Sequence, residues 1–173
     1  MTRLTTHRLV LSELAEADAP FIVALLNDPD WIRYIGDRKV RTLDDARVYV
    51  RNGPMAMYAR EGFGLYRTAL AHDDTPIGLC GLIRRPTLAD VDIGFAFLPA
   101  HRGYGYALES ATAVLAQARA IGLHRVVAIV SPDNAPSAAL LARLGFALER
   151  PIRLAEDDAL LDLYARELAR AQM

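Results

Sequence analysis

A glycine-rich segment in the second half of the chain combines a positive charge with two flexible backbone positions. It reads Arg102-Gly103-Tyr104-Gly105-Tyr106-Ala107 and lies between an alternating apolar segment and a helical pattern. A strand that turns through two glycines into a helix gathers backbone N–H groups and the positive end of the helix dipole at one point. Such a point attracts anions, and a guanidinium beside it adds a fixed positive charge. The segment predicts a phosphate site, with an ordinary glycine turn as the structural alternative.

Two common phosphate-binding motifs do not fit this segment. A dinucleotide fingerprint requires a third glycine three residues after the second, where this chain has Leu108. A Walker loop requires Gly-Lys-Ser/Thr, and the only lysine of the chain is Lys39. The segment therefore belongs to neither class of nucleotide site.

The apolar segment before the glycines alternates with the period of a β-strand. Its bulky residues are predicted to face the core, and its other face carries a carboxylate and mostly small residues: Asp92, Gly94, Ala96 and Leu98. Small residues leave room for a ligand along the strand, with its reactive end near Asp92. The structural alternative is a helix that packs on the two smallest residues, with Asp92 near a solvated end.

Polar residues also precede a later predicted helix. Asn134 is a good N-cap, Ser137 lies three residues beyond it, and Gly145 closes the helix. Capping explains these residue types on its own. A structural role of Asn134 therefore competes with a role in ligand binding.

The order of these segments resembles the GNAT (GCN5-related) N-acetyltransferase superfamily, and in particular its RimJ/RimL-like branch. The similar features are an apolar strand, the Arg-Gly-x-Gly loop, an amphipathic helix, a strand, an Asn-x-x-Ser helix and a Leu-Gly-Phe sequence at 144–146. Segments 6–14, 18–20 and 26–29 are similar to that branch as well. The resemblance covers nearly the whole chain and leaves the acceptor unspecified.

The resemblance implies a binding site for acetyl-CoA. In the family the glycine-rich loop receives the pyrophosphate, the preceding strand splays from the next one to hold the pantetheine arm, and the asparagine contacts the cofactor. In this chain the implied contacts are backbone groups of Phe97 and Leu98, the Asn134 side chain, and the loop residues Arg102, Gly103, Tyr104, Gly105, Tyr106 and Ala107.

Two positions depart from the family pattern. Ala100 lies three residues before the first glycine, where Gln or Arg is usual, so one side-chain contact is missing or is replaced by His101. Leu141 lies where many members carry a tyrosine that protonates the departing thiolate. A serine has been considered for that role in the RimJ/RimL-like branch, which indicates Ser137, with water as the competing donor.

The implied activity is direct transfer of an acetyl group from acetyl-CoA to a primary amine of a protein N-terminus or a small molecule. Asp92 is the predicted base that takes the proton of the amine. Candidates for the acceptor pocket, with core packing as the alternative for each, are Trp31, Tyr34, Phe63 and Tyr66. Because fold alone does not establish chemistry, a catalytically idle acyl-CoA-binding module for sensing or assembly is the alternative function.

Composition indicates one soluble domain over residues 1–173. Apolar residues make up 53%, yet no run approaches the ~20 residues of a membrane span. The N-terminus has no signal pattern, so we expect a cytoplasmic monomer or homodimer without a membrane partner. The 20 basic and 21 acidic residues give no support for nucleic-acid binding. With one cysteine, Cys80, and scattered histidines, neither a disulfide nor a metal site is expected.

Periodicity and turn signals predict the elements that position these residues. We predict helices at 17–27 and 104–121 and strands at 7–14, 63–71, 76–84, 90–98 and 125–130. Thr42 begins a further helix, which 52–54 should stop or kink. The periodicity of 160–168 fits a helix or a strand, and the resemblance favours the strand. The resemblance implies an α/β fold, a mixed and mainly antiparallel sheet of about six or seven strands flanked by helices, with a splayed acetyl-CoA cleft.

Overall fold

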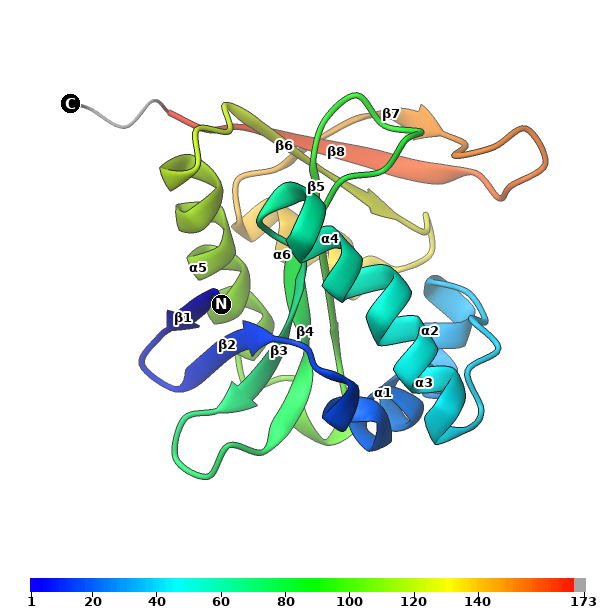
Figure 1. The fold of residues 1–173 in the computed structure, drawn as a ribbon. Helices are drawn as coiled ribbons and strands as arrows, with labels where there is room; N and C mark the ends of the chain where they lie inside the picture. Colours follow the sequence, from blue (N-terminus) through cyan, green and yellow to red (C-terminus); the bar gives the residue numbers. More distant parts are fainter. Residues whose placement is uncertain (170–173) are drawn as a thin grey trace.

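The computed structural model describes residues 1–169, and its centre is one eight-stranded sheet (Figure 1). The strand order is β1-β2-β3-β4-β5-β6-β8-β7. The strands are β1 (Arg3–Thr5), β2 (Leu9–Glu13), β3 (Leu65–Leu70), β4 (Pro76–Ile83), β5 (Asp92–Phe97), β6 (Arg125–Val130), β7 (Ala147–Ile152) and β8 (Leu161–Glu167). All neighbouring strands are antiparallel except β5 and β6. The mixed, mainly antiparallel sheet is confirmed, and residues 170–173 of the predicted domain lie outside the described residues.

Helices cover both faces of this sheet. The helices α5 (Tyr106–Ala120) and α6 (Ala135–Arg143) contribute to the apolar cluster on one face. The other face is covered by α1 (Ala19–Leu26), α2 (Pro29–Tyr34) and α3 (Leu43–Val50), as Figure 1 shows. The sheet is thus the middle layer of three, which is the flanked arrangement that the sequence predicts.

The predicted alternation along β5 is confirmed by the two clusters. Ile93 and Phe97 are buried with the apolar side of α5, whereas Ala96 and Leu98 pack toward the helices on the opposite face. Because successive side chains of a strand point to opposite faces, the small residues of β5 all face the N-terminal helices. The face with room for a ligand is therefore the one that α2 and α3 border.

The helix that begins after Thr42 kinks and does not stop. Thr42 and Asp45 form a capping box, in which the Asp45 N–H donates to the Thr42 hydroxyl oxygen at 3.1 Å. A π-helical turn at Arg51–Met55 contains Pro54, and α4 (Ala56–Glu61) continues to Gly62. Because proline has no N–H and crowds the preceding turn, a wider turn carries the chain past it.

The two outer strands were not predicted individually. β1 has only three residues, and β7 exposes almost all of its side chains, so neither has an apolar pattern of its own. The ambiguous tail forms β8, which pairs with β6 from Arg125↔Glu167 to Val130↔Asp162. The periodicity of this segment fits a helix as well as a strand, and its pairing with the buried strand β6 makes it a strand.

Candidate active site

A cleft of about 730 Å³ opens where β5 and β6 diverge. The register of these two strands contains one pair, Asp92↔Val127, and the Val127 N–H donates to the Val91 carbonyl at 3.0 Å. Beyond that pair both strands line the cleft, and α2 and α6 contribute further walls. We name the end at Asp92, where the two strands still pair, the closed end of the cleft, and the end at the glycine-rich loop, where they lie apart, the open end.

Backbone groups dominate the open end of the cleft. Gly103 and Gly105 both have φ of +82°, in the left-handed region that glycine adopts without strain. Gly105 is the N-cap of α5 and has no side chain to cap it. The first helical bond runs from the Glu109 N–H to the Gly105 carbonyl at 3.0 Å, so the N–H groups before Glu109 have no acceptor within the helix. Because Tyr106 and Ala107 line the cleft, this helix start can bind an anion there.

The Arg102 side chain is turned toward α2. Its two terminal nitrogens pair with Asp30 at 2.5 Å and with Asp28 at 2.6 Å, and its Nε donates to the Phe97 carbonyl at 2.9 Å. The carboxylates of Asp28 and Asp30 therefore neutralise the positive charge of Arg102, which was predicted to face the phosphate. The Arg102 guanidinium attaches the loop to α2, and the backbone N–H groups at the start of α5 are the groups that can bind an anion.

Arg8 approaches the loop from the turn between β1 and β2 and was not predicted. Its Nη1 donates to the Tyr104 carbonyl at 2.9 Å, and its guanidinium carbon lies 4.5 Å from the centre of the Tyr106 ring. The Arg8 Nε pairs with Glu109 at 2.7 Å. The Tyr104 side chain itself is exposed. The hydrogen bond joins residues 96 positions apart, so no local pattern predicts it.

Asp92 forms the closed end of the cleft and is 1% exposed. Its Oδ1 lies 3.0 Å from the Nε of Arg85. Burial raises the pKa of Asp92 to about 6, although the charge and hydrogen bond of Arg85 act in the opposite direction. A carboxyl group with this pKa is mostly ionised at neutral pH and can accept a proton. Arg85 was not predicted, although the hairpin register Ile83↔Asp92 places it near Asp92.

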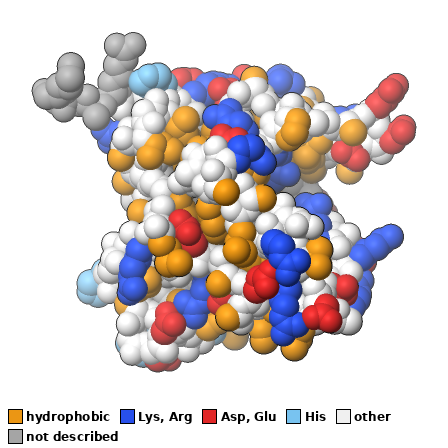
Figure 2. Space-filling view, viewed as in Figure 1, with side chains coloured by type: hydrophobic (Ala, Val, Ile, Leu, Met, Phe, Trp, Pro, Cys, Tyr) orange, Lys and Arg blue, Asp and Glu red, His pale blue; other side chains and the backbone are white. Residues whose placement is uncertain are grey.

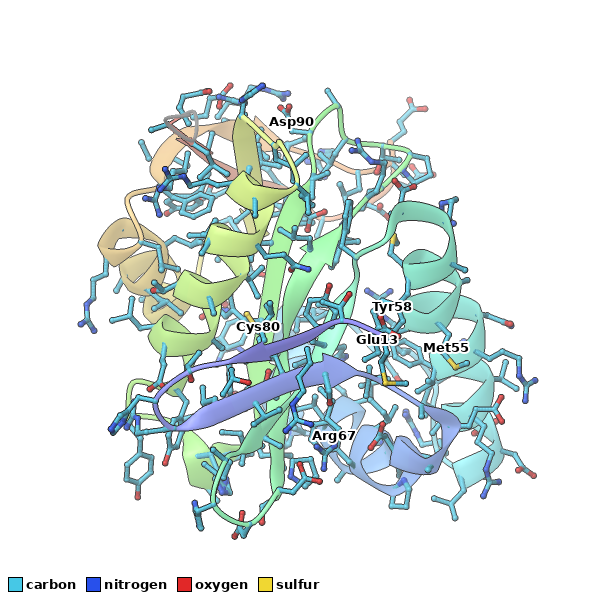
Figure 3. The ribbon with its side chains drawn as sticks, turned by 60° about the vertical axis from the view of Figure 1, so that its left-hand side comes forward. Glu13, Met55, Tyr58, Arg67, Cys80 and Asp90 are labelled. Carbon is cyan, nitrogen blue, oxygen red and sulfur yellow. The ribbon has the colours of Figure 1, made fainter. Side chains whose placement is uncertain are left out.

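Asp90 lies only two positions earlier but in a different environment. It is part of the connection before β5, at the end of the sheet shown in Figure 3, and it does not line the cleft. Its carboxylate accepts from the Arg125 Nε at 3.1 Å, and Arg125 also pairs with Glu149 and, at 2.7 Å, with Glu167. Asp90 therefore belongs to a surface ion-pair cluster.

Asn134 and Ser137 line the cleft from the start of α6. The Ser137 N–H donates to the Asn134 Oδ1 at 3.3 Å, which makes Asn134 the N-cap. This cap uses the amide oxygen and leaves the amide NH₂ for the cleft. Leu141 is completely buried in the core.

The four aromatic candidates divide into two pairs. Trp31 and Tyr34 of α2 line the cleft, whereas Phe63 and Tyr66 do not and are buried in the cluster on the opposite face of the sheet. The Tyr66 hydroxyl accepts from the Gln117 Nε2 of α5 at 2.8 Å. The prediction that Phe63 and Tyr66 line the acceptor pocket is therefore wrong. The alternation of β3 turns Leu65, and not Tyr66, toward the cleft, and Phe63 lies before this strand with its side chain buried in the core.

Outside the cleft, the described residues contain little further chemistry. Cys80 is buried in the sheet (Figure 3), and burial raises the pKa of its thiol to about 12. Within residues 1–169, no three His, Cys, Asp or Glu side chains gather to hold a metal ion. No helix in that range is long and apolar enough to span a membrane. Basic and acidic side chains are interspersed on the face in Figure 2.

An open mixed sheet that splays between two parallel strands is the fold of the GNAT acetyltransferases. The family model described as "Acetyltransferase (GNAT) domain" matches residues 8–147. The chain belongs to this family and is an acetyl-CoA-dependent N-acetyltransferase.

Relatives and solved structures agree with this assignment. The chain is 28% identical over 153 residues to "Uncharacterized N-acetyltransferase YoaA" of Bacillus subtilis, covering 87% of this chain and 85% of the relative. An acetyltransferase structure from Agrobacterium tumefaciens has a TM-score of 0.81 at 28% identity, covering 96% of this chain and 94% of that one. RimL, a ribosomal L7/L12 alpha-N-protein acetyltransferase in complex with coenzyme A, has a TM-score of 0.80 at 20% identity, with coverages of 96% and 98%.

Proposed function

We propose that this chain transfers the acetyl group of acetyl-CoA directly to a primary amine of a protein N-terminus or a small molecule. The observation that carries the proposal is Asp92, a buried carboxyl group at the closed end of a cleft whose open end is an uncapped helix start. The RimL complex contains coenzyme A and is described as an N-terminal protein acetyltransferase. Its similar fold supports this cofactor and this kind of acceptor.

The residues along the cleft fit the chemistry of acetyl-CoA. The helix start at Gly105 suits the pyrophosphate, with the loop backbone from Arg102 to Ala107 around it. Gly94 and Ala96 leave room for the pantetheine arm, which would meet backbone groups of Phe97 and Leu98 and the amide NH₂ of Asn134. Asp92 lies five positions before Phe97, roughly 17 Å along a strand, so an extended arm can reach it.

Asp92 and Ser137 supply the proton transfers in this proposal, and acetyl-CoA supplies the acetyl group as a thioester. An aliphatic amine with a pKa of roughly 8–10 is mostly protonated at neutral pH, so Asp92 accepts its proton directly or through water. The Ser137 hydroxyl donates a proton to the departing thiolate. Leu141 cannot do so, because it is buried and its side chain has no proton donor. Trp31 and Tyr34 line the cleft from α2 and are the proposed contacts of the acceptor.

Thiol release in the presence of different amines tests this function. Purified protein is mixed with acetyl-CoA and a panel of N-terminal peptides and small amines, with the N-acetylated form of each peptide as its matched control. We expect release of free CoA only with the unblocked amines and a mass increase of one acetyl group on the acceptor. Tight binding of CoA without amine-dependent release across the panel would contradict the proposal and favour an idle binding module.

A further inference from the structure

Helix α2 is attached to the protein on both sides of the open end of the cleft. On the β5 side, Arg102 pairs with Asp28 and Asp30 at the start of α2. On the β6 side, Arg33 and Tyr34 at the end of α2 contact the segment that follows β6. The six residues of α2 therefore bridge the two strands where they lie apart.

The attachment on the β5 side, which we name the anchor, consists of Arg102, Asp28 and Asp30. The Asp28 carboxylate is 5% exposed, and its Oδ2 also accepts from the Trp31 N–H at 3.3 Å, so it caps α2 as well. Arg102 adds a hydrogen bond from its Nε to the carbonyl of Phe97, the last residue of β5. Because the Asp28 carboxylate is buried, removing Arg102 would leave a buried charge without its partner, so this side of α2 resists opening.

The attachment on the β6 side, which we name the latch, is more exposed. The Ser131 hydroxyl donates to the Tyr34 carbonyl at 3.0 Å, and the Arg33 Nη2 lies 3.2 Å from the Asp133 Oδ2. The Arg33 and Asp133 side chains are 60% and 62% exposed. Exposed ion pairs are weak and screened by salt, so the latch opens more easily than the anchor.

The sheet itself does not fix the width of this end. β5 and β6 share a single register pair at Asp92↔Val127, which lies at the opposite end of the cleft. We propose that α2 is a strap that sets the spacing of the two strands at the open end, with Arg102 and Arg33 as positioning residues. The anchor holds α2 and the loop in register, and the latch opens to admit and release acetyl-CoA. This inference rests on the proposed function, because acetyl-CoA is the ligand that passes the strap.

Reversing the charges of the latch tests the strap. Asp133→Arg and Arg33→Asp each place like charges together, and the double variant restores an ion pair in the opposite sense. Two quantities are measured: amide hydrogen exchange of α2 without any ligand, and the dissociation rate of CoA after mixing with excess acetyl-CoA. Each single variant should increase both by roughly twofold to fivefold, the range of an exposed pair, and the double variant should return to within twofold of wild type.

Two further variants control this experiment. Glu16→Arg breaks the exposed ion pair with Arg51, which lies away from the latch, and should change neither quantity. Ser131→Ala removes the other half of the latch without changing charge and should increase both. Unchanged α2 exchange in Asp133→Arg and Ser131→Ala, or a double variant that is no better than the single ones, would overturn the strap. The exchange measurement uses no ligand, so failure of the strap is distinguishable from failure of CoA to bind.

Discussion

The two ends of the cleft are built from different chemistry. The open end presents backbone N–H groups of a helix whose N-cap, Gly105, has no side chain. The closed end presents one buried carboxylate, Asp92, paired with Arg85. Backbone donors hold an anion without changing protonation state, whereas proton transfer requires a side chain with a suitable pKa. The difference indicates that cofactor binding and chemistry can be separated by mutation.

The largest expected effect is at the closed end. Asp92→Asn keeps the shape of the side chain and removes the group that accepts the proton. We expect turnover to fall by roughly 10²–10⁴-fold, the range for loss of general-base catalysis, while the affinity for CoA stays within about twofold. Steady-state thiol release and calorimetric titration with CoA measure the two quantities. A fall of less than threefold would show that positioning and solvent suffice.

Asp90→Asn is the matched control for that variant. It makes the same chemical change two positions earlier, where the carboxylate faces Arg125 outside the cleft. Turnover should stay within about twofold of wild type, because surface ion pairs contribute little. An equal loss in both variants would attribute the effect to the local fold and not to the cleft.

The second effect is at the open end. Gly105→Glu places a bulky anion where the phosphate is expected, and we expect CoA affinity to fall by roughly 100-fold, about 2.7 kcal/mol. Gly122→Glu is the matched control, because Gly122 also has a positive φ, +88°, but follows the far end of α5. Thermal shift with CoA compares them. A folded Gly105→Glu protein with wild-type affinity would refute the loop assignment.

Ser137→Ala tests the proposed proton donor to the thiolate, since Ser137 lines the cleft from the first turn of α6. CoA affinity should be nearly unchanged, and the rate of thiol release in a pre-steady-state measurement should fall by roughly tenfold if the hydroxyl is the proton donor. Equal release rates in wild type and variant would leave water as the donor.

The smallest effects concern the cap of α6. Asn134→Ala should lower the free energy of unfolding by about 0.5–2 kcal/mol, because the bond from the Ser137 N–H is lost. Asn134→Asp caps comparably, so stability should be kept, but it loses the amide donor and should weaken CoA binding several-fold. Denaturant unfolding and calorimetry separate the two. Unchanged CoA binding in Asn134→Asp would reduce Asn134 to a cap.

Much of the fold was predictable from the sequence because its patterns are local. The alternation of 91–98 assigned the two faces of β5, and Gly122 marked the end of α5. β7 was missed because its side chains are exposed and its residues have no apolar period. Periodicity alone could not assign β8, because its pairing with β6 decides that it is a strand, and local periodicity does not reveal pairing between distant segments.

The candidate site was predictable only in part. Short sequence patterns mark the glycine-rich loop and Asp92, so both could be predicted as parts of the site. Arg85 and the turn of Arg102 toward Asp28 depend on tertiary contacts. Tyr66 was predicted to line the site and does not. An aromatic residue type suits a pocket, but it does not tell which face of β3 the residue occupies.

The most direct test of the account is the pH dependence of single-turnover acetyl transfer in wild type and Asp92→Asn with the same acceptor. Wild type can use the protonated acceptor because Asp92 takes its proton, whereas Asp92→Asn depends on the small fraction of acceptor that is already a neutral amine, so the two rates should depend differently on pH. Its pKa is raised from 3.8 to about 6, and the carboxylate must be ionised to accept a proton. The wild-type rate should rise about tenfold per pH unit below about pH 6 and level off above about pH 7. The Asp92→Asn rate should keep rising until the amine itself is deprotonated, so the ratio of wild type to variant should fall above about pH 7. A ratio that stays constant from about pH 5 to pH 8 would contradict the assignment of Asp92 as the base.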